Sequence, residues 1–222
     1  MVNLKTLSPS ERARQLGNPE GDVGFEISLR LNKINSKITD HVYARLGLNT
    51  GMKVLEIGFG NGHLLPDLLG RSDGLEYIGI DISQIMVDEA RQFNAAQVAS
   101  GQAAFHLASA ENIPSDAAQF DRVFAVNVIY FWADPLRPLQ EIRRVLRPDG
   151  LSVIAATSPA TSAATDFQRP EFGFHTRDDS TLMALHSQAG FTRVAVENYH
   201  EIVSAPDGSP WTRDYYLIIA QP

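Results

Sequence analysis

An alternation of strand and helix patterns between residues 53 and 157 is the feature that most limits the fold. Short apolar runs bounded by glycine or polar residues predict strands at 53–57, 77–80, 104–107, 120–126 and 151–157. The longer segments between them predict helices at 63–69, 83–98 and 135–146. Such alternation builds a parallel sheet with helices on both faces. The sequence therefore predicts an α/β, Rossmann-like, doubly wound fold.

The chain before this region predicts a long helix that follows a polar arm. Apolar residues recur at spacings of three and four from Ile27 to Leu46, which predicts one amphipathic helix. The first 25 residues are rich in turn formers and predict a loosely ordered arm with a short helix near 10–16. Because 222 residues suit one α/β domain, we expect residues 1–50 to be an arm and cap helix of the same domain as residues 51–222.

The chain after residue 157 breaks the alternation. Residues 178–188 predict a helix, and two β-rich runs follow at 193–202 and 215–220. The segment between these runs contains Pro206-Asp207-Gly208-Ser209-Pro210, so it is too short and too rich in turn formers for a crossover helix. The two strands are therefore expected to be antiparallel, so that a mostly parallel sheet ends in an antiparallel strand.

Composition excludes several classes of protein. The chain has no cysteine, which excludes a disulfide scaffold and a thiolate metal site, and its six histidines show no metal-ligand spacing. The net charge of −7 disfavours nucleic acid as a partner, and the arginines near Arg144 are interrupted by Glu141, as on a solvated helix face. Neither a signal-peptide core nor an apolar run of membrane-spanning length is present. We therefore expect a cytoplasmic protein without a metal and without membrane insertion.

A glycine-rich loop follows the first predicted strand. The strand at 53–57 leads into Gly58-Phe59-Gly60-Asn61-Gly62 and then into a helix. Glycine permits positive φ angles and lets another molecule approach the backbone closely. In an open α/β sheet, ligands bind outside the carboxyl ends of the strands. Tight strand-to-helix turns also use glycine for structural reasons, so the loop by itself leaves both interpretations open.

Asp81 strengthens the ligand interpretation. It ends the second predicted strand, so its carboxylate faces the same crevice and can accept hydrogen bonds from both hydroxyls of a ribose. Its alternative role is to cap the following helix. Ser83 can perform that capping itself, which leaves the Asp81 carboxylate available to a nucleoside.

Two departures from the dinucleotide pattern decide which nucleotide fits. A dinucleotide loop reads G-x-G-x-x-G/A, but His63 occupies the position of the third small residue. Glu56 precedes the loop, where a carboxylate would repel a pyrophosphate and attract a cationic amino-acid group. Both departures favour a zwitterionic, sulfonium-bearing ligand over NAD.

An ordered set of motifs resembles a known family. Glu56-x-Gly58-x-Gly60-x-Gly62 and Asp81 are followed by Ala110-Glu111-Asn112-Ile113-Pro114, Phe120-Asp121-Arg122-Val123-Phe124 and Leu146-Arg147-Pro148-Asp149-Gly150. With this order and spacing, the chain resembles class I S-adenosylmethionine-dependent methyltransferases, and most closely their ubiquinone/menaquinone-biosynthesis (type 11) group. The resemblance implies a seven-stranded sheet with an antiparallel last strand. It also implies S-adenosylmethionine as cofactor and S-adenosylhomocysteine as product.

The resemblance also implies roles for individual residues. The methionine and ribose portions would contact Glu56, Gly58, Gly60, Asn61, Gly62, Asp81 and Asn127. The adenine would lie against Ile82, Ala110 and Glu111. One position departs from the family, which commonly has an acidic residue where this chain has Ser109. The contact to the adenine amino group is then open between Ser109, Glu111 and a main-chain carbonyl.

The acceptor region is predicted from aromatic residues outside these motifs. Candidates are the helix at 25–35, the aromatic run at 130–132 and the long connection at 158–179. His175 is a candidate general base, and Tyr130 is a candidate for packing around the sulfonium or an aromatic acceptor. For each residue, ordinary packing is the competing explanation.

The sequence thus predicts in-line transfer of a methyl group from S-adenosylmethionine to a small, partly apolar molecule. Two alternatives remain open at this stage. One is an NAD(P)-dependent oxidoreductase, and the other is a non-catalytic protein that binds S-adenosylmethionine.

Overall fold

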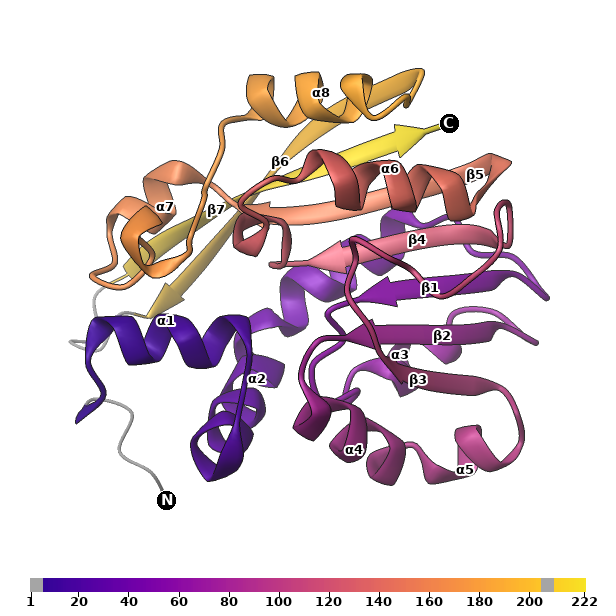
Figure 1. Ribbon diagram of the computed structural model, residues 1–222, viewed down its shortest axis with the longest axis horizontal. Helices are drawn as coiled ribbons and strands as arrows, with labels where there is room; N and C mark the ends of the chain where they lie inside the picture. The colour runs from indigo at the N-terminus through magenta and orange to yellow at the C-terminus, as the bar shows by residue number, and fades with distance from the viewer. Residues whose placement is uncertain (1–5, 205–209) are drawn as a thin grey trace.

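The computed structural model describes residues 6–204 and 210–222 as a sheet with helices on both faces (Figure 1). The sheet has seven strands in the order β3-β2-β1-β4-β5-β7-β6. The strands are β1 Lys53–Ile57, β2 Glu76–Asp81, β3 Ala103–Leu107, β4 Phe120–Val126, β5 Leu146–Thr157, β6 Arg193–Ser204 and β7 Pro210–Gln221. Neighbouring strands from β3 to β5 are parallel, and β7 is antiparallel to both β5 and β6. The predicted fold class and the antiparallel end of the sheet are confirmed.

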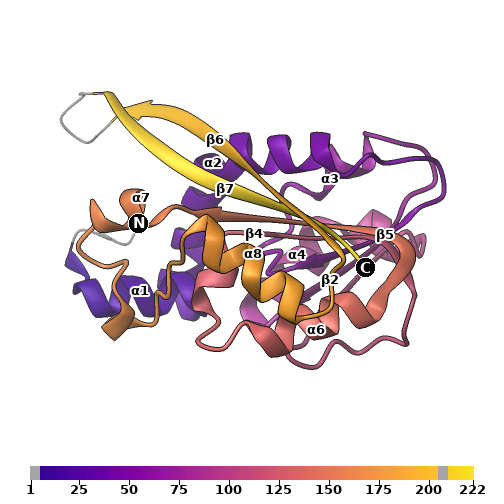
Figure 2. The same ribbon diagram turned by 90° about the horizontal axis from the view of Figure 1, so that it is seen from above.

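Helices cover the two faces of the sheet (Figure 2). They are α1 Pro9–Gly17, α2 Gly21–Arg45, α3 Leu65–Leu69, α4 Gln84–Phe93, α5 Ala95–Ala99, α6 Leu136–Val145, α7 Pro159–Ala163 and α8 Asp179–Gln188, with short 3₁₀ helices at Ile129–Phe131 and Pro170–Phe172. One apolar core joins the sheet to α2, α3 and α4 through residues such as Val42, Leu68 and Val87. The other joins the opposite face to α6 and α8 through Leu139 and Leu182. None of the described helices is long and apolar enough to cross a membrane.

The predicted helix at 83–98 is wrong in one respect, because it is two helices that meet at Asn94. The side-chain amide of Asn94 donates hydrogen bonds to the carbonyl oxygens of Ala90 and Gly62, both at 3.0 Å. Short polar side chains compete with the helix for backbone partners in this way. Asn94 at this break therefore links the end of α4 to the glycine loop. The hydrophobic periodicity of the sequence does not reveal this contact.

The arm before the long helix is more ordered than predicted. The short helix near 10–16 is present as α1, but α2 begins at Gly21 rather than near Ile27. The side chain of Arg12 in α1 forms an ion pair of 2.6 Å with Asp166, and its guanidinium lies 5.2 Å from the centre of the Phe167 ring. These contacts with a distant segment order the arm.

Two further boundaries differ from the sequence expectation. Strand β5 begins at Leu146, directly after α6, and a register shift occurs where it pairs with β4 between Phe120 and Arg122. The hairpin of β6 and β7 is longer than predicted, and it extends past the rest of the sheet on the side of α1 and α7 (Figure 2). The predicted turn at 206–210 lies outside the described residues, apart from Pro210.

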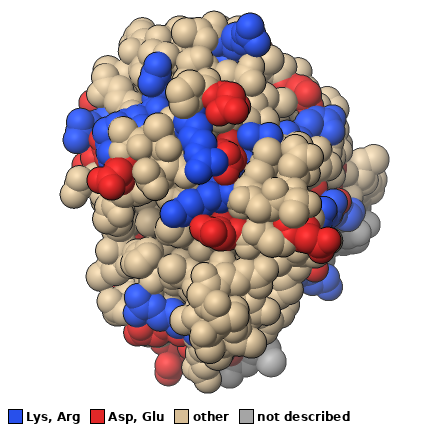
Figure 3. Space-filling model, turned by 90° about the vertical axis from the view of Figure 1, so that its right-hand side faces the viewer, with Lys and Arg blue, Asp and Glu red and all other residues tan. Residues whose placement is uncertain are grey.

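The basic residues of α6 and of the start of β5 are mostly occupied by ion pairs. Arg144 lies 2.8 Å and Arg137 3.7 Å from the carboxylate of Glu141, and Arg147 pairs with Asp121. On the face shown in Figure 3, basic and acidic side chains are interspersed. Paired charges of this kind suit a solvated surface.

The ring of Phe124 links α2 to the centre of the sheet. It is fully buried and meets the ring of Tyr43 edge to face, with centroids 5.5 Å apart. We predict that Phe124→Ala lowers the free energy of unfolding by about 3–5 kcal/mol, because it removes a large buried side chain and leaves a cavity. Phe93→Ala is the matched control, since Phe93 is 52% exposed. Urea unfolding measures both variants, and similar losses in the two would contradict the prediction.

Candidate active site

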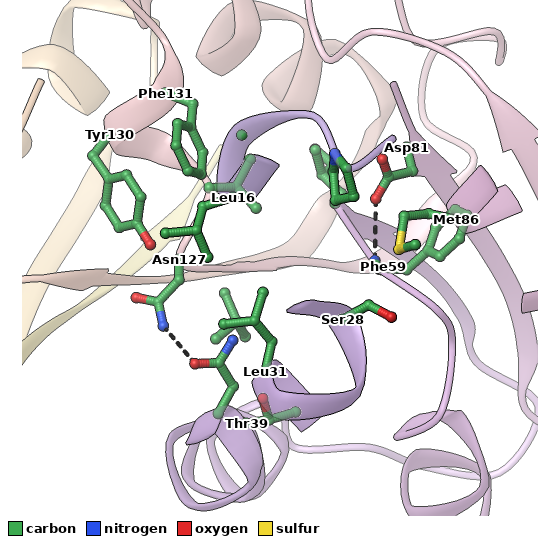
Figure 4. Close-up of a pocket in the computed structure, with 18 of the residues that line it drawn as sticks. Leu16, Ser28, Leu31, Thr39, Phe59, Asp81, Met86, Asn127, Tyr130 and Phe131 are labelled. Carbon is green, nitrogen blue, oxygen red and sulfur yellow. Dashed lines mark hydrogen bonds between the residues drawn. The ribbon is translucent and has the colours of Figure 1, made fainter. Parts of the chain in front are cut away.

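A cavity of about 460 Å³ lies at the carboxyl ends of the parallel strands. The glycine loop after β1, the end of β2 and the segments after β3 and β4 line its inner wall, and α1, α2 and β7 contribute the outer wall. Figure 4 shows Asp81 and Asn127 on opposite sides of this space, with Leu31 of α2 between them. The position agrees with the general rule that ligands of such sheets bind beyond the carboxyl ends of the strands.

The three glycines of the loop serve different physical needs. All have positive φ angles, +73° at Gly58, +61° at Gly60 and +69° at Gly62, where a side chain would be strained. A Cβ atom on Gly58 would lie 2.5 Å from Val128, and one on Gly62 would lie 2.8 Å from Ala90. A Cβ atom on Gly60 would meet no protein atom within 4 Å. The outer glycines thus allow close packing, whereas Gly60 faces open space in the cavity wall.

The carboxylate of Asp81 connects the loop to the next helix. One oxygen accepts a hydrogen bond from the amide of Gly60 at 3.1 Å, and the other accepts one from the amide of Ser83 at 2.9 Å. Ser83 in turn caps α4, as predicted, by accepting a hydrogen bond from the amide of Met86. Burial raises the pKa of Asp81 to about 6, although the backbone donors partly offset this effect.

Glu56 is a second carboxylate in the cavity wall. The hydroxyl of Tyr77 donates a hydrogen bond of 2.6 Å to it. Burial raises the pKa of Glu56 to about 7, the Tyr77 hydrogen bond lowers it, and the charge of Asp81 raises it further. Two carboxylates in one desolvated wall favour a cation in the adjacent space.

Asn127 lies where β4 ends and joins three elements. Its φ angle is +59°, which is uncommon for a residue with a side chain. Its side-chain nitrogen donates to the side-chain oxygen of Asn35 in α2 at 3.2 Å, and its side-chain oxygen accepts from the hydroxyl of Thr157 at 3.1 Å. Strained positions of this kind persist where surrounding contacts over-determine them. Asn127 is therefore held rigidly in the wall of the cavity.

Aromatic side chains form the part of the cavity beyond Asn127. Tyr130 stacks on Phe174 with ring centroids 5.0 Å apart, and Phe131 meets Phe174 edge to face at 4.7 Å. Trp132 and Phe167 also line this part. Burial raises the pKa of Tyr130 far above its ordinary value, so it remains a neutral phenol, and it shares a hydrogen bond with Thr157.

Most of the predicted site residues meet in this cavity. Those that line it are Glu56, Gly58, Gly60, Asn61, Gly62, Asp81, Ile82, Ser109, Ala110, Asn127 and Tyr130. Glu111 and His175 are not among its lining residues. Glu111 is exposed, and its carbonyl accepts a hydrogen bond from Arg137. The amide of His175 donates to the carbonyl of Tyr130 at 2.7 Å, so this residue supports the aromatic part through its backbone.

Sequence reasoning did not single out two groups of lining residues. One is a polar stripe on α2, formed by Ser28, Asn32, Asn35 and Thr39, of which the first three lie within the helix at 25–35 that was predicted to border the acceptor. The spacing of three and four residues was visible in the sequence beside the apolar stripe, and it indicates a second functional face of the helix. The other group is one face of β7, formed by Trp211, Arg213 and Tyr215. Its two-residue period was visible, but the strand to which it belongs was predicted to begin only at Tyr215.

Comparisons with known proteins agree with this architecture. Residues 55–154 match the model of a methyltransferase domain family. An O-methyltransferase of Aspergillus sclerotiorum is 31% identical over 54% of this chain and 45% of its own length. An O-methyltransferase of Penicillium expansum is 30% identical over 76% of this chain and 62% of its own length. The chain thus spans less than two thirds of the length of these two relatives.

A solved structure shares the whole fold. A chain in the complex between the Haloferax volcanii Trm112 methyltransferase activator and the putative methyltransferase superposes with a TM-score of 0.74 at 19% identity. The match covers 96% of this chain and 97% of that one. The strand order and the methyltransferase domain matched at residues 55–154 are those of class I S-adenosylmethionine-dependent methyltransferases.

The open space beside Gly60 leads to a first prediction for the site. Gly60→Ala should weaken binding of S-adenosylhomocysteine about tenfold or more, because the added methyl group enters the ligand space. Gly101→Ala is the matched control, since Gly101 has a φ of +77° and its Cβ would also meet no atom within 4 Å. Both variants should lose about 1 kcal/mol of stability, and calorimetry should detect the affinity loss only for Gly60→Ala. An equal loss of affinity in both would contradict this role.

The raised pKa of Glu56 leads to a second prediction. A carboxyl group whose folded pKa lies above its unfolded value stabilises the fold at low pH and loses that contribution as the pH rises. In the unliganded protein this loss runs from about pH 4.5 to about pH 7. Glu56→Gln should therefore be more stable than the wild type at about pH 8, by up to about 3 kcal/mol, and should lose this advantage at about pH 5. Urea unfolding at both pH values measures the stability difference between the variant and the wild type. If the pKa of Glu56 were normal, this difference would be the same at both pH values.

Proposed function

We propose that the chain transfers a methyl group from S-adenosylmethionine to a small acceptor molecule with a largely aromatic or apolar body. One observation carries the proposal. The cavity runs from Glu56, Gly60 and Asp81, at the ends of β1 and β2, to the aromatic residues beyond Asn127. A site for a nucleoside and an apolar space in the same cavity suit a methyl donor and a methyl acceptor that have to be bound next to each other.

The residues at the first end fit the cofactor. Gly60 leaves room beside the backbone, and the carboxylate of Asp81 faces the cavity where it can accept hydrogen bonds from ribose hydroxyls. Glu56 would attract the ammonium group of the methionine portion. Ile82 is 53% exposed although apolar, and an adenine ring would cover it.

Further residues would complete the cofactor site. Ser109 and Ala110 would lie along the adenine edge, and Asn127 would hold the methionyl portion. Glu111 is exposed and does not line the cavity. The contact to the adenine amino group would therefore come from Ser109 or from a main-chain carbonyl. When bound, the cofactor supplies a methyl group that is activated by the positive charge of its sulfur.

The protein then has to orient the acceptor and exclude water. The aromatic walls formed by residues such as Tyr130, Phe131 and Phe174 provide a desolvated space, and orientation alone can contribute about 7–11 kcal/mol. Tyr130 remains neutral, so its role is to pack and to hydrogen-bond rather than to remove a proton. We assign no proton transfer to His175, since its side chain does not line the cavity. Positioning is therefore the main catalytic contribution of the chain.

The names of three relatives support a small-molecule acceptor. The two fungal relatives are O-methyltransferases, and a relative from Amycolatopsis mediterranei is a 27-O-demethylrifamycin SV methyltransferase. The last name is that of an enzyme for a small molecule, which favours, for the present chain, an acceptor of similar kind over a macromolecule.

Binding and transfer experiments test the proposal. Calorimetry should show that S-adenosylhomocysteine binds and NADH does not, and labelled S-adenosylmethionine should transfer its label to a member of a panel of phenols, aromatic acids and apolar alcohols. Asp81→Asn should weaken S-adenosylhomocysteine binding about tenfold or more, because it removes the charge and one of the two oxygens that accept from the amides of Gly60 and Ser83. Binding of NADH alone would favour an oxidoreductase. Binding of S-adenosylhomocysteine without transfer to any acceptor would favour a non-catalytic protein.

A further inference from the structure

Strand β7 presents one face of its outer half to the cavity. Trp211, Arg213 and Tyr215 alternate along the strand, so their side chains point to the same side, and all three line the cavity. Tyr215 pairs in register with Thr157, whose hydroxyl donates to Asn127. The β7 face therefore adjoins the point where the cofactor end and the aromatic end of the cavity meet.

Arg213 lies in an unusual environment for a charged side chain. Its side chain is only 12% exposed, and its guanidinium lies 5.9 Å from the centre of the Tyr215 ring. One terminal nitrogen donates to Glu201 at 2.8 Å and to the carbonyl of Ile34 in α2 at 3.1 Å. The Nε–H group is buried without a hydrogen-bond partner among the described residues. A buried donor without a partner is costly, so the guanidinium retains capacity for a further acceptor.

The charges around the cavity are separated along its length. Two carboxylates, those of Glu56 and Asp81, line the cofactor end, whereas Arg213 is the only lysine or arginine among the lining residues that the structure describes. Glu201 does not simply cancel the charge of Arg213, because Lys37 lies 3.7 Å from its other oxygen. Two cations therefore share one carboxylate. The β7 end of the cavity is complementary to an anion.

We propose that the acceptor carries a carboxylate on its aromatic or apolar body, and that Arg213 binds this carboxylate. The proposal rests on the proposed methyl transfer and narrows its substrate class. Arginine suits this role because the free Nε–H of its charged group can donate a hydrogen bond to a carboxylate while its planar face stacks on aromatic rings. The rings of Trp211 and Tyr215, on either side of Arg213 along the strand, provide the apolar surface for the rest of the molecule. Arg213 is thus a specificity-determining residue.

Pairs of small probes that differ only in charge test the proposal. The probes are 4-hydroxybenzoate against 4-hydroxybenzamide, and indole-3-acetate against indole-3-acetamide, titrated near neutral pH into protein saturated with S-adenosylhomocysteine. The carboxylate of each pair should bind at least about tenfold more tightly than the amide. Arg213→Gln should abolish this preference, and Arg213→Lys should retain part of it.

Arg45→Gln is the matched control. Arg45 also pairs with a glutamate of β6, since its Nε lies 2.7 Å from Glu197, but it is 40% exposed and does not line the cavity. This variant should keep the full preference for the carboxylate. The double variant Arg213→Gln/Glu201→Gln separates binding from folding, because it leaves no unpaired buried carboxylate at Glu201. It should lose the preference while it binds S-adenosylhomocysteine as the wild type does.

Three results would overturn the proposal: equal binding of acid and amide by the wild type, no binding of either acid, or the same preference in the Arg213 and Arg45 variants. If the proposed methyl transfer itself is wrong, the wild type will not bind S-adenosylhomocysteine. In that case the same probe pairs are titrated into the protein without S-adenosylhomocysteine, and they show whether Arg213 selects a carboxylate.

Discussion

The carboxylate of Asp81 holds together parts of the molecule that the rest of the site requires in fixed positions. It accepts hydrogen bonds from the amides of Gly60 and Ser83, and thereby joins the loop after β1 to the start of α4 after β2. Because Asp81 is buried, each of these hydrogen bonds offsets part of the cost of removing a carboxylate from water. The raised pKa of Asp81 shows that the offset is incomplete. A ligand that supplies further donors to this carboxylate would offset more of that cost.

Charge is arranged along the cavity in a way that suits two different molecules. The acidic end has desolvated carboxylates, and the β7 end has a guanidinium whose charge is incompletely compensated. In surroundings of low dielectric, such opposite fields orient a cationic ligand toward one end and an anionic one toward the other. Asn127, held by Asn35 and Thr157, lies between the two ends. The buried aromatic residues beyond Asn127 shield this part of the cavity from water.

The positions of elements and loops could be predicted from the sequence where the physical cause is local. The glycine loop and Asp81 were expected at neighbouring strand ends, and they lie there, because strand, turn and helix follow one another directly and the sheet brings the ends of adjacent strands together. The break at Asn94 was not predictable, because the side chain that causes it binds the carbonyl of Gly62, thirty-two residues away in the chain. The order of α1 likewise depends on a distant partner, Asp166.

The sequence by itself determined the sheet class, the antiparallel end of the sheet and the family motifs, because residue periodicity and turn chemistry act over a few positions. Only the tertiary structure decided which side chains share the cavity. It brought in the polar stripe of α2 and the Trp211, Arg213 and Tyr215 face of β7, and it left the side chains of Glu111 and His175 outside the lining. The physical reason is that a cavity forms between elements far apart in the chain. Its lining therefore depends on how α1, α2 and the long hairpin pack over the strand ends, and no local pattern encodes that packing.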